Sequence, residues 1–213
     1  MDAAPLSASS VGRERSPGAA VAVVVSGILA LFFAPASLGL VRETLHFNCS
    51  WDIGGEWGPD GSWLCADGIG YLGVAAVVGV MSVGVLLAGL LLAFARPSFR
   101  RTIAYLALAA LSLAWMGGWT FAAAMSYTGA RPEGETGPGL WAAAVLPALA
   151  LCTLGLLVGA VGALSSRRWS AVLLSVGVGL ILAGTVLQPG IGVATIVSAG
   201  MLVAAGTGRQ RAL

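Results

Sequence analysis

Six apolar stretches, separated by short polar segments, run along the chain at about 18–41, 68–95, 103–126, 141–165, 169–187 and 190–207. None of these stretches contains Asp, Glu, Lys, Arg or His. A helix of about 20 apolar residues crosses the hydrocarbon core of a bilayer, because its backbone polar groups are paired within the segment. The pattern therefore predicts an all-α, polytopic transmembrane helix bundle with six spans, joined as three consecutive outward hairpins.

The first and the last stretch each allow a second interpretation. Ala34-Pro35-Ala36 follows a basic segment and an apolar run, as at a signal-peptide cleavage site. Because the apolar run continues beyond this triplet, we favour a retained helix. The stretch 190–207 is short and rich in glycine, so a re-entrant segment with only five spans is the alternative. The arginine-containing tail 208–213 favours a complete sixth span.

The charged residues between the stretches sort by side. One side carries most of the arginines: Arg13, Arg15, Arg96, Arg100, Arg101, Arg167, Arg168, Arg209 and Arg211. The other side carries most of the acidic residues: Glu43, Asp52, Glu56, Asp60, Asp67, Glu133 and Glu135. Only Arg42, Arg131, Asp2 and Glu14 depart from this pattern. By the positive-inside rule the arginine side is cytoplasmic, so we expect a cell-membrane protein with both termini in the cytoplasm.

This assignment divides the chain into a bundle at 18–207 and two cytoplasmic tails, at 1–17 and 208–213, of which the first is expected to be disordered. The longest polar segment is the loop 42–67, which is expected outside the cell. A segment of this length cannot bury an independent soluble core. We therefore expect no separate catalytic or nucleic-acid-binding domain.

The composition indicates lipid rather than water as the surroundings of most of the chain. Hydrophobic residues make up 58% and charged residues 9%, whereas soluble domains carry about 25% charged residues. The net charge of +2 is no nucleic-acid signature. Lysine is absent and Ala, Gly, Val, Leu and Arg dominate, which is typical of a high-GC bacterial genome. We expect the lipid bilayer, and no nucleic acid, as a partner.

Cys49 and Cys65 lie in the loop on the oxidising side and predict a disulfide that staples it. The alternatives are a metal site that includes His46 and a redox-active pair. The metal site lacks a fourth ligand at a recognisable spacing, and the cysteines are too far apart for CxxC chemistry. We therefore expect a structural disulfide, no metal and no cofactor.

Trp51, Trp57 and Trp63 recur between these cysteines. The turn signal Pro59-Asp60-Gly61 predicts a small hairpin in which Trp57 and Trp63 face each other. The indoles either rest on the membrane interface and the helix ends, or form an outer contact patch for a protein or glycan.

Small residues at helical spacing predict close helix packing, because lipid supplies no hydrophobic force between helices and backbones must approach closely. The predicted packing residues are Ala110, Ala114 and Gly118 in the third stretch, Gly155 and Gly159 in the fourth, and Gly179 in the fifth. Packing within one chain and packing between copies in a homo-oligomer both fit this pattern.

The apolar stretches hold no Asp, Glu, Lys, Arg or His, which argues against ion-coupled transport and proton relays. We therefore expect no enzyme activity. The favoured hypothesis is a non-catalytic accessory or scaffold subunit of a bacterial envelope assembly, in contact with another membrane protein. The alternatives are a passive channel or facilitator for a small neutral solute, and a membrane thiol oxidoreductase.

Overall fold

The structure, a computed structural model, describes residues 17–51, 61–126, 131–165 and 168–207. Within these residues, five segments are long and apolar enough to cross a membrane, and a bent helix pair makes a sixth if it is taken as one span. The predicted apolar helical architecture is therefore confirmed, and the chain has the helices that a multi-pass membrane protein requires. One small hairpin of strands accompanies the helices in the described part.

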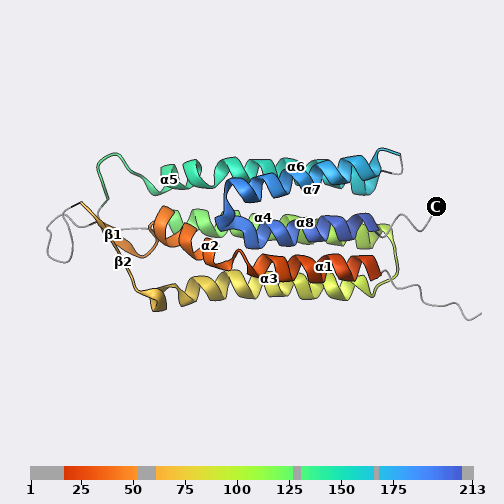
Figure 1. Cartoon of the computed structure of the whole chain (residues 1–213), viewed down its shortest axis with the longest axis horizontal. Coiled ribbons are helices and arrows are strands. Elements are labelled where there is room, and N and C mark those ends of the chain that lie inside the picture. The colour runs from red at the N-terminus through yellow and green to blue at the C-terminus, as the bar shows by residue number, and fades with distance from the viewer. Residues whose placement is uncertain (1–16, 52–60, 127–130, 166–167, 208–213) are drawn as a thin grey trace, which may run out of the picture.

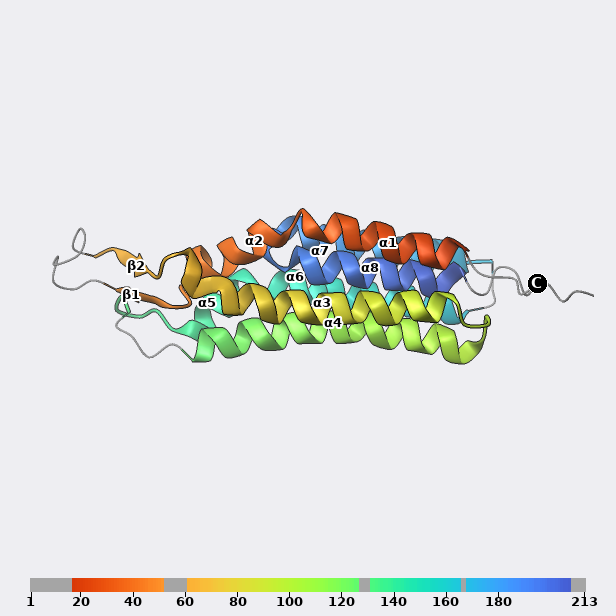
Figure 2. The ribbon, with the colours of Figure 1, turned by 90° about the horizontal axis from the view of Figure 1, so that it is seen from below.

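The elements follow one another along a single elongated bundle (Figures 1 and 2). In chain order they are α1 (Pro17–Leu31), α2 (Ala34–Gly39), the π-helical turn η1 (Leu40–Thr44), β1 (Cys49–Trp51), β2 (Trp63–Cys65), the 3₁₀ turn η2 (Gly68–Tyr71), α3 (Leu72–Ala93), α4 (Phe99–Met125), α5 (Gly137–Ala144), α6 (Leu146–Leu164), α7 (Ser170–Leu187), the 3₁₀ turn η3 (Pro189–Ile191) and α8 (Gly192–Thr207).

The two ends of the bundle differ in their connections (Figure 1). The strands β1 and β2 and the connection from α4 to α5 lie at one end, which we call the hairpin end. The α3–α4 and α6–α7 connections and the end of α8 lie at the other, which we call the arginine end. Of the described arginines, Arg96 and Arg168 lie in these connections, and Arg100 and Arg101 lie in the first turn of α4, which follows one of them. Apart from Arg42 and Arg131, the described arginines are thus gathered at the arginine end.

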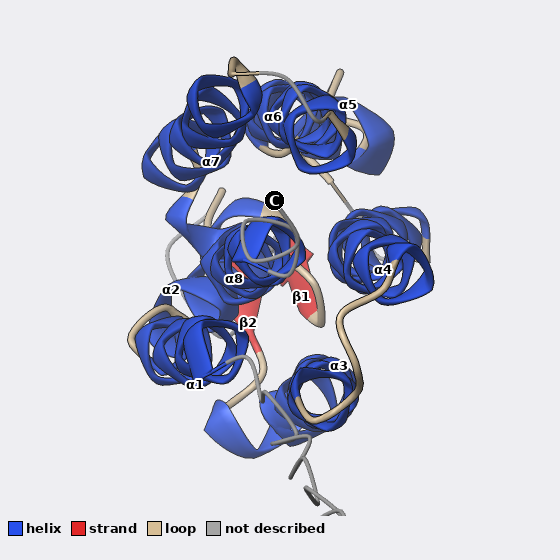
Figure 3. Cartoon of the chain, turned by 90° about the vertical axis from the view of Figure 1, so that its right-hand side faces the viewer, coloured by secondary structure: helices blue, strands red, loops and turns tan. Residues whose placement is uncertain are grey.

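The helix α8 occupies the centre of the bundle (Figure 3). In the segment Pro189–Thr207, 83% of the residues in an 18-residue window are buried, a larger share than in any other candidate span among the described residues. Glycines allow this close approach, since a Cβ atom at Gly200 would collide with Ser26 of α1. The stretch with the weakest sequence signal for a span is therefore the helix against which the others pack.

The first apolar stretch is broken rather than continuous, contrary to the single helix expected over 18–41. Its two parts, Pro17–Leu31 and Ala34–Thr44, are bent by 52° with respect to each other. Pro35 stands in the first turn of α2 and has no N–H to donate. Its ring would also clash with the carbonyl of Leu31, four residues earlier, so the helix ends before it.

The second half of the α7–α8 turn, Gly190 and Ile191, is buried in the bundle, whereas Pro189 is exposed. Ile191 is only 1% exposed, and a Cβ at Gly190 would collide with Leu40. Gln188 pairs the polar groups of this turn: its Nε2 donates to the carbonyl of Ala144 at 3.0 Å, and its Oε1 accepts from the Gly190 N–H at 3.1 Å. Since unpaired backbone groups are costly in an apolar interior, one side chain thus satisfies both the turn and the end of α5.

Two helices begin earlier than the hydrophobic pattern indicated. The helix α4 starts at Phe99 and not at 103, because the Ser98 hydroxyl accepts from the Arg101 N–H at 3.2 Å and caps it. Arg101 is 4% exposed, and its Nη1 donates to the Ala95 carbonyl at 3.0 Å, just beyond α3. Similarly, α5 starts at Gly137 under a Thr136 cap. The polar segments of the sequence show where the apolar stretches end, but α4 and α5 each extend into the polar segment that precedes them.

The small-residue positions divide into packed and exposed ones. Gly155 and Gly159 lie where α6 meets α7: a Cβ at Gly177 of α7 would come within 2.6 Å of the Gly155 carbonyl oxygen and of the Gly159 backbone. Gly118 and Gly179, in contrast, are exposed, and a Cβ at either would meet nothing within 4 Å. Gly118 and Gly179 therefore make no close helix contact within the described part of the chain, and their packing against another copy stays a prediction.

The stripe on α4 has the same outward orientation. Ala110 and Ala114 are exposed like Gly118, while the buried face of α4 combines other small residues, such as Ala109 and Gly117, with larger and polar ones. From this inner face Tyr105 donates to the Gly89 carbonyl at 3.0 Å, and Ser112 donates to the Ala194 carbonyl of α8 at 3.1 Å. Because buried hydroxyls that join two helices fix their register, these contacts take the place that the small residues were expected to fill.

Candidate functional site

The hairpin end carries a disulfide-linked cap. β1 and β2 are antiparallel, and Cys49 lies opposite Cys65, Ser50 opposite Leu64, and Trp51 opposite Trp63. Cys49 and Cys65 are joined in a disulfide, as predicted. Since both sulfurs are used, the metal site considered with His46 lacks its thiolate ligands. In the described part no group of three or more His, Cys, Asp or Glu side chains is placed to hold a metal.

The aromatic residues of the cap pack on one another. The Trp63 ring stacks on His46, with 4.0 Å between ring centroids and 9° between ring planes. The Trp63 ring also meets Trp51 edge-on, with 5.2 Å between ring centroids. Among the described residues the cross-strand partner of Trp63 is Trp51. The predicted pairing of Trp57 with Trp63 concerns a residue outside the described part of the chain. The spacing of residues does not indicate that His46 packs on Trp63. The φ of His46 is 51°, which places its backbone in the left-handed region.

The cap is attached to the bundle through Phe47. The Tyr71 hydroxyl donates to the Phe47 carbonyl at 2.8 Å, and the Phe47 ring meets Trp119 of α4 edge-on at 6.3 Å. Below these contacts, Val41, Tyr71 and Val74 form a small buried cluster. The hairpin is thus an extension of the folded bundle and positions its rings at a fixed place on this end.

The surroundings of His46 favour its neutral form. Burial lowers its pKa below the ordinary value of 6.5, Glu135 acts in the opposite direction, and Arg131 lowers it further. Because the unfolded chain binds the proton more readily, the stabilising contribution of neutral His46 is present above pH 6.5 and is lost as the pH falls through the lowered pKa.

The only histidine of the chain allows a direct measurement of this effect. We expect the imidazole proton resonances of detergent-solubilised protein to titrate below pH 6.5 in NMR spectra. Glu135→Gln removes the carboxylate that favours the imidazolium, so the pKa should fall further. A midpoint at or above 6.5, or a rise in the Glu135→Gln variant, would show that His46 is not enclosed in this way.

A groove of about 560 Å³ runs along the outside of α4. Its α4 wall carries the exposed small residues Ala110, Ala114 and Gly118. Its opposite wall comes from α5 and α6, with Trp141 and Leu149. The predicted stripe of small residues therefore lines a recess on the surface of the bundle.

The walls of the groove are fixed by contacts below its surface. The Trp141 Nε1 donates to the Thr120 hydroxyl at 2.9 Å, and the Trp141 ring meets Phe121 edge-on at 5.1 Å. Thr153, the hydroxyl-bearing residue on the α6 wall, donates to its own helix, at the Leu149 carbonyl, at 2.8 Å. The groove therefore presents an apolar surface whose polar groups are already paired.

The centre of the described bundle is filled by α8. Val197, Met201 and Leu202 are fully buried, and the Thr185 and Thr195 hydroxyls are bonded to each other at 2.6 Å between α7 and α8. A passive channel through this axis would require α8 to move aside. The hydroxyls of Thr185 and Thr195 thus form part of the contact between α7 and α8.

Comparison of the chain with protein-family models, with curated proteins and with solved structures returns no match.

Proposed function

We propose that this protein is a non-catalytic accessory or scaffold subunit of a bacterial envelope assembly, and that it receives a transmembrane helix of a partner protein in the groove on α4. The observation that carries the proposal is the position of Ala110, Ala114 and Gly118. They are small, they recur at the spacing of one helix face, and they are exposed along a recess. In lipid, such a face is where a second backbone approaches closely.

The proposal places the protein in the cell membrane with six crossings, in three outward hairpins. The bent pair Pro17–Leu31 and Ala34–Thr44 serves as the first crossing. The gathering of arginines at one end supports a cytoplasmic location for that end and for both termini. The disulfide-linked cap then lies on the oxidising side, where disulfides persist.

The cap supplies a second contact in this proposal. Trp51 and Trp63 are half-buried and engaged with each other and with His46, so their main role is to shape the hairpin. Trp57 lies between them in the sequence, and we propose it, with the edges of the other two rings, as an outer contact patch. A second copy of this chain in the groove would instead make a homo-oligomer.

The groove proposal is tested by filling the groove with a bulky side chain. Gly118→Ile should reduce the yield of a co-purified partner at least about tenfold, which corresponds to ~1.4 kcal/mol. Gly84→Ile is the matched control, because Gly84 is also exposed in a helix and a Cβ there meets nothing within 4 Å. The measurement is quantitative mass spectrometry of proteins retained after purification from source membranes in mild detergent.

Three outcomes distinguish the possibilities. Loss of a distinct partner in Gly118→Ile alone supports the scaffold proposal. Loss of a second copy of this chain identifies the groove as a homo-oligomer interface. Equal retention in both variants contradicts a helix in this groove.

A further inference from the structure

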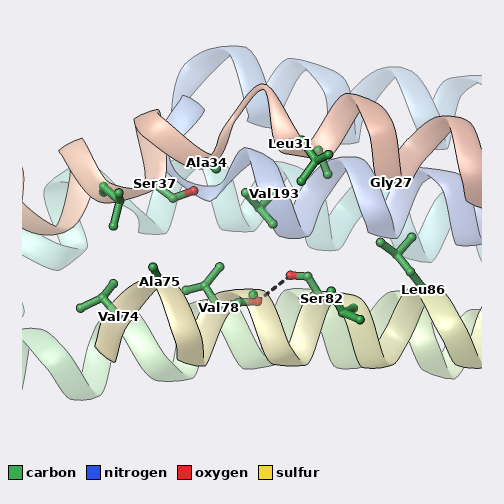
Figure 4. Close-up of a pocket in the computed structure, with 14 residues that line it drawn as sticks. Gly27, Leu31, Ala34, Ser37, Val74, Ala75, Val78, Ser82, Leu86 and Val193 are labelled. Carbon is green, nitrogen blue, oxygen red and sulfur yellow. Dashed lines mark hydrogen bonds between the residues drawn. The ribbon is translucent and has the colours of Figure 1, made fainter. Parts of the chain in front are cut away.

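A second recess lies on another face of the bundle, between the bent α1–α2 pair and α3 (Figure 4). It is a pocket of about 160 Å³. Leu31 and Ser37 contribute from the α1–α2 side, Val78 and Ser82 from α3, and Val193 of the central helix α8 closes its inner wall. It shares no lining residue with the groove on α4.

The pocket follows from the break in the first apolar stretch. Because Pro35 ends α1, the segment Ala34–Thr44 leaves the α1 direction by 52°, and the pocket lies beside this bend. Small residues border the space thus created, and a Cβ at Gly79 of α3 would meet nothing within 4 Å. The space is therefore a consequence of the local sequence on both helices.

The lining of the pocket suits hydrocarbon and not water. Its two hydroxyls are already committed to their own helices: Ser37 donates to the Phe33 carbonyl at 3.2 Å, and Ser82 donates to the Val78 carbonyl at 2.8 Å. A buried water needs about 2–4 polar partners, and an apolar cavity of about 150 Å³ stays dry while admitting small hydrocarbons. The occupant is therefore apolar where it lies in the pocket.

The mouth of the pocket faces the surroundings of the bundle. Leu31 is 72% exposed and Val83 is 54% exposed, and both border the pocket. They lie in apolar segments of membrane-spanning length, so the mouth opens sideways toward lipid acyl chains. A chain from the surrounding bilayer reaches the pocket without crossing a polar region.

An exposed arginine follows the pocket-lining segment along the chain, toward the hairpin end. Leu38 borders the pocket and is 36% exposed, and Arg42 follows it by about one helical turn and is also exposed. Arg42 and Arg131 are the two arginines that depart from the sorting of charges. Arg131 donates to the Ala124 carbonyl at the end of α4 at 3.4 Å, which gives it a capping role. Arg42 is exposed and lies beyond the pocket toward the hairpin end, so it could pair with the anionic head group of a lipid whose acyl chain lies in the pocket.

From these observations we infer that the pocket binds one acyl chain of an anionic phospholipid from the membrane, with the lipid phosphate paired to Arg42. The chain fills the space left by the bend at Pro35, and its head group remains at the interface on the hairpin side. Guanidinium groups bind phosphate through parallel N–H donors, which favours an anionic lipid whose phosphate is accessible. This inference does not depend on the partner helix proposed for the groove on α4.

The test uses the full chain in bilayer nanodiscs that contain equal amounts of phosphatidylglycerol and phosphatidylcholine. After transfer to mild detergent, native mass spectrometry counts the lipids retained per chain. Gly79→Phe fills the pocket, and Gly79→Leu is a milder second variant that keeps the test valid if the larger ring impairs folding. Gly84→Phe is the matched control, since Gly84 lies on the same helix, outside the pocket, with nothing within 4 Å of its Cβ.

We expect one tightly retained phospholipid, mainly phosphatidylglycerol, on the wild type and on Gly84→Phe. Gly79→Phe and Gly79→Leu should retain it at least about tenfold less, equivalent to ~1.4 kcal/mol. Arg42→Gln should keep a lipid but lose the preference for phosphatidylglycerol over phosphatidylcholine. Equal retention by the Gly79 and Gly84 variants would overturn the assignment of the chain to this pocket, and an unchanged preference in Arg42→Gln would overturn the role of Arg42.

Discussion

Replacing Gly177 by valine is expected to separate α6 from α7, whereas Gly179→Val, two residues further along α7, should leave stability nearly unchanged. A Cβ at Gly177 would lie 2.6 Å from the Gly159 Cα and N atoms and from the Gly155 carbonyl oxygen. These are backbone atoms of a facing helix, so no side-chain rotation relieves the overlap. At Gly179 a Cβ meets nothing within 4 Å.

The expected loss for Gly177→Val is about 3 kcal/mol, the upper end of the range for overpacked interiors. Gly179→Val should remain within about 0.5 kcal/mol of the wild type, as is usual for exposed positions. The measurement is thermal unfolding of both variants in the same detergent, followed by circular dichroism. Equal unfolding temperatures for the two variants would show that the α6–α7 contact is looser than described.

Loss of the disulfide is expected to destabilise the cap by about 3 kcal/mol, the chain-entropy estimate for a closed loop of about 15 residues. The double variant Cys49→Ser, Cys65→Ser removes the link that holds β1 opposite β2. The effect should remain local, because the helices are held by contacts of their own, such as Tyr105 to the Gly89 carbonyl and Ser112 to the Ala194 carbonyl. We expect the Trp51–Trp63 contact to loosen while the helical content stays the same.

Limited proteolysis and tryptophan fluorescence measure this opening of the cap, and circular dichroism measures the helices. Reduction of the wild type is a second route to the same state, since the remaining cysteine, Cys152, is buried and forms no disulfide. Ser50→Ala is the control for substitution on β1. Unchanged protease resistance in the double variant would mean that the aromatic contacts alone hold the hairpin.

The helices and the disulfide could be predicted from sequence because each depends on local signals. Apolar runs without charge mark the helices, and two cysteines in one polar loop mark the disulfide. The break at Pro35 also has a local cause, but we did not expect it because the apolar run continues through it. The helix starts at Phe99 and Gly137 were missed because their caps lie among residues taken as loop.

The arrangement of the helices could not be predicted, because it depends on which faces meet. Gly177 and Gly179 are the same residue type on the same helix, yet one faces α6 and the other faces outward. The central position of α8 could not be predicted either, because the helix is apolar on all sides and its sequence marks no buried face. His46 stacks on Trp63 from a backbone with a left-handed φ. The spacing of residues in the sequence does not predict this backbone conformation.

The central claim is that the groove on α4 receives a helix of another protein. Its most direct test is photo-crosslinking in unbroken source membranes, with a benzophenone amino acid placed at Ala114 in the groove and, in an otherwise identical strain, at Gly84 on α3. We predict a discrete protein adduct from position 114 and only lipid adducts from position 84. Lipid adducts alone from both positions would contradict the account, because the groove would then be filled by the bilayer.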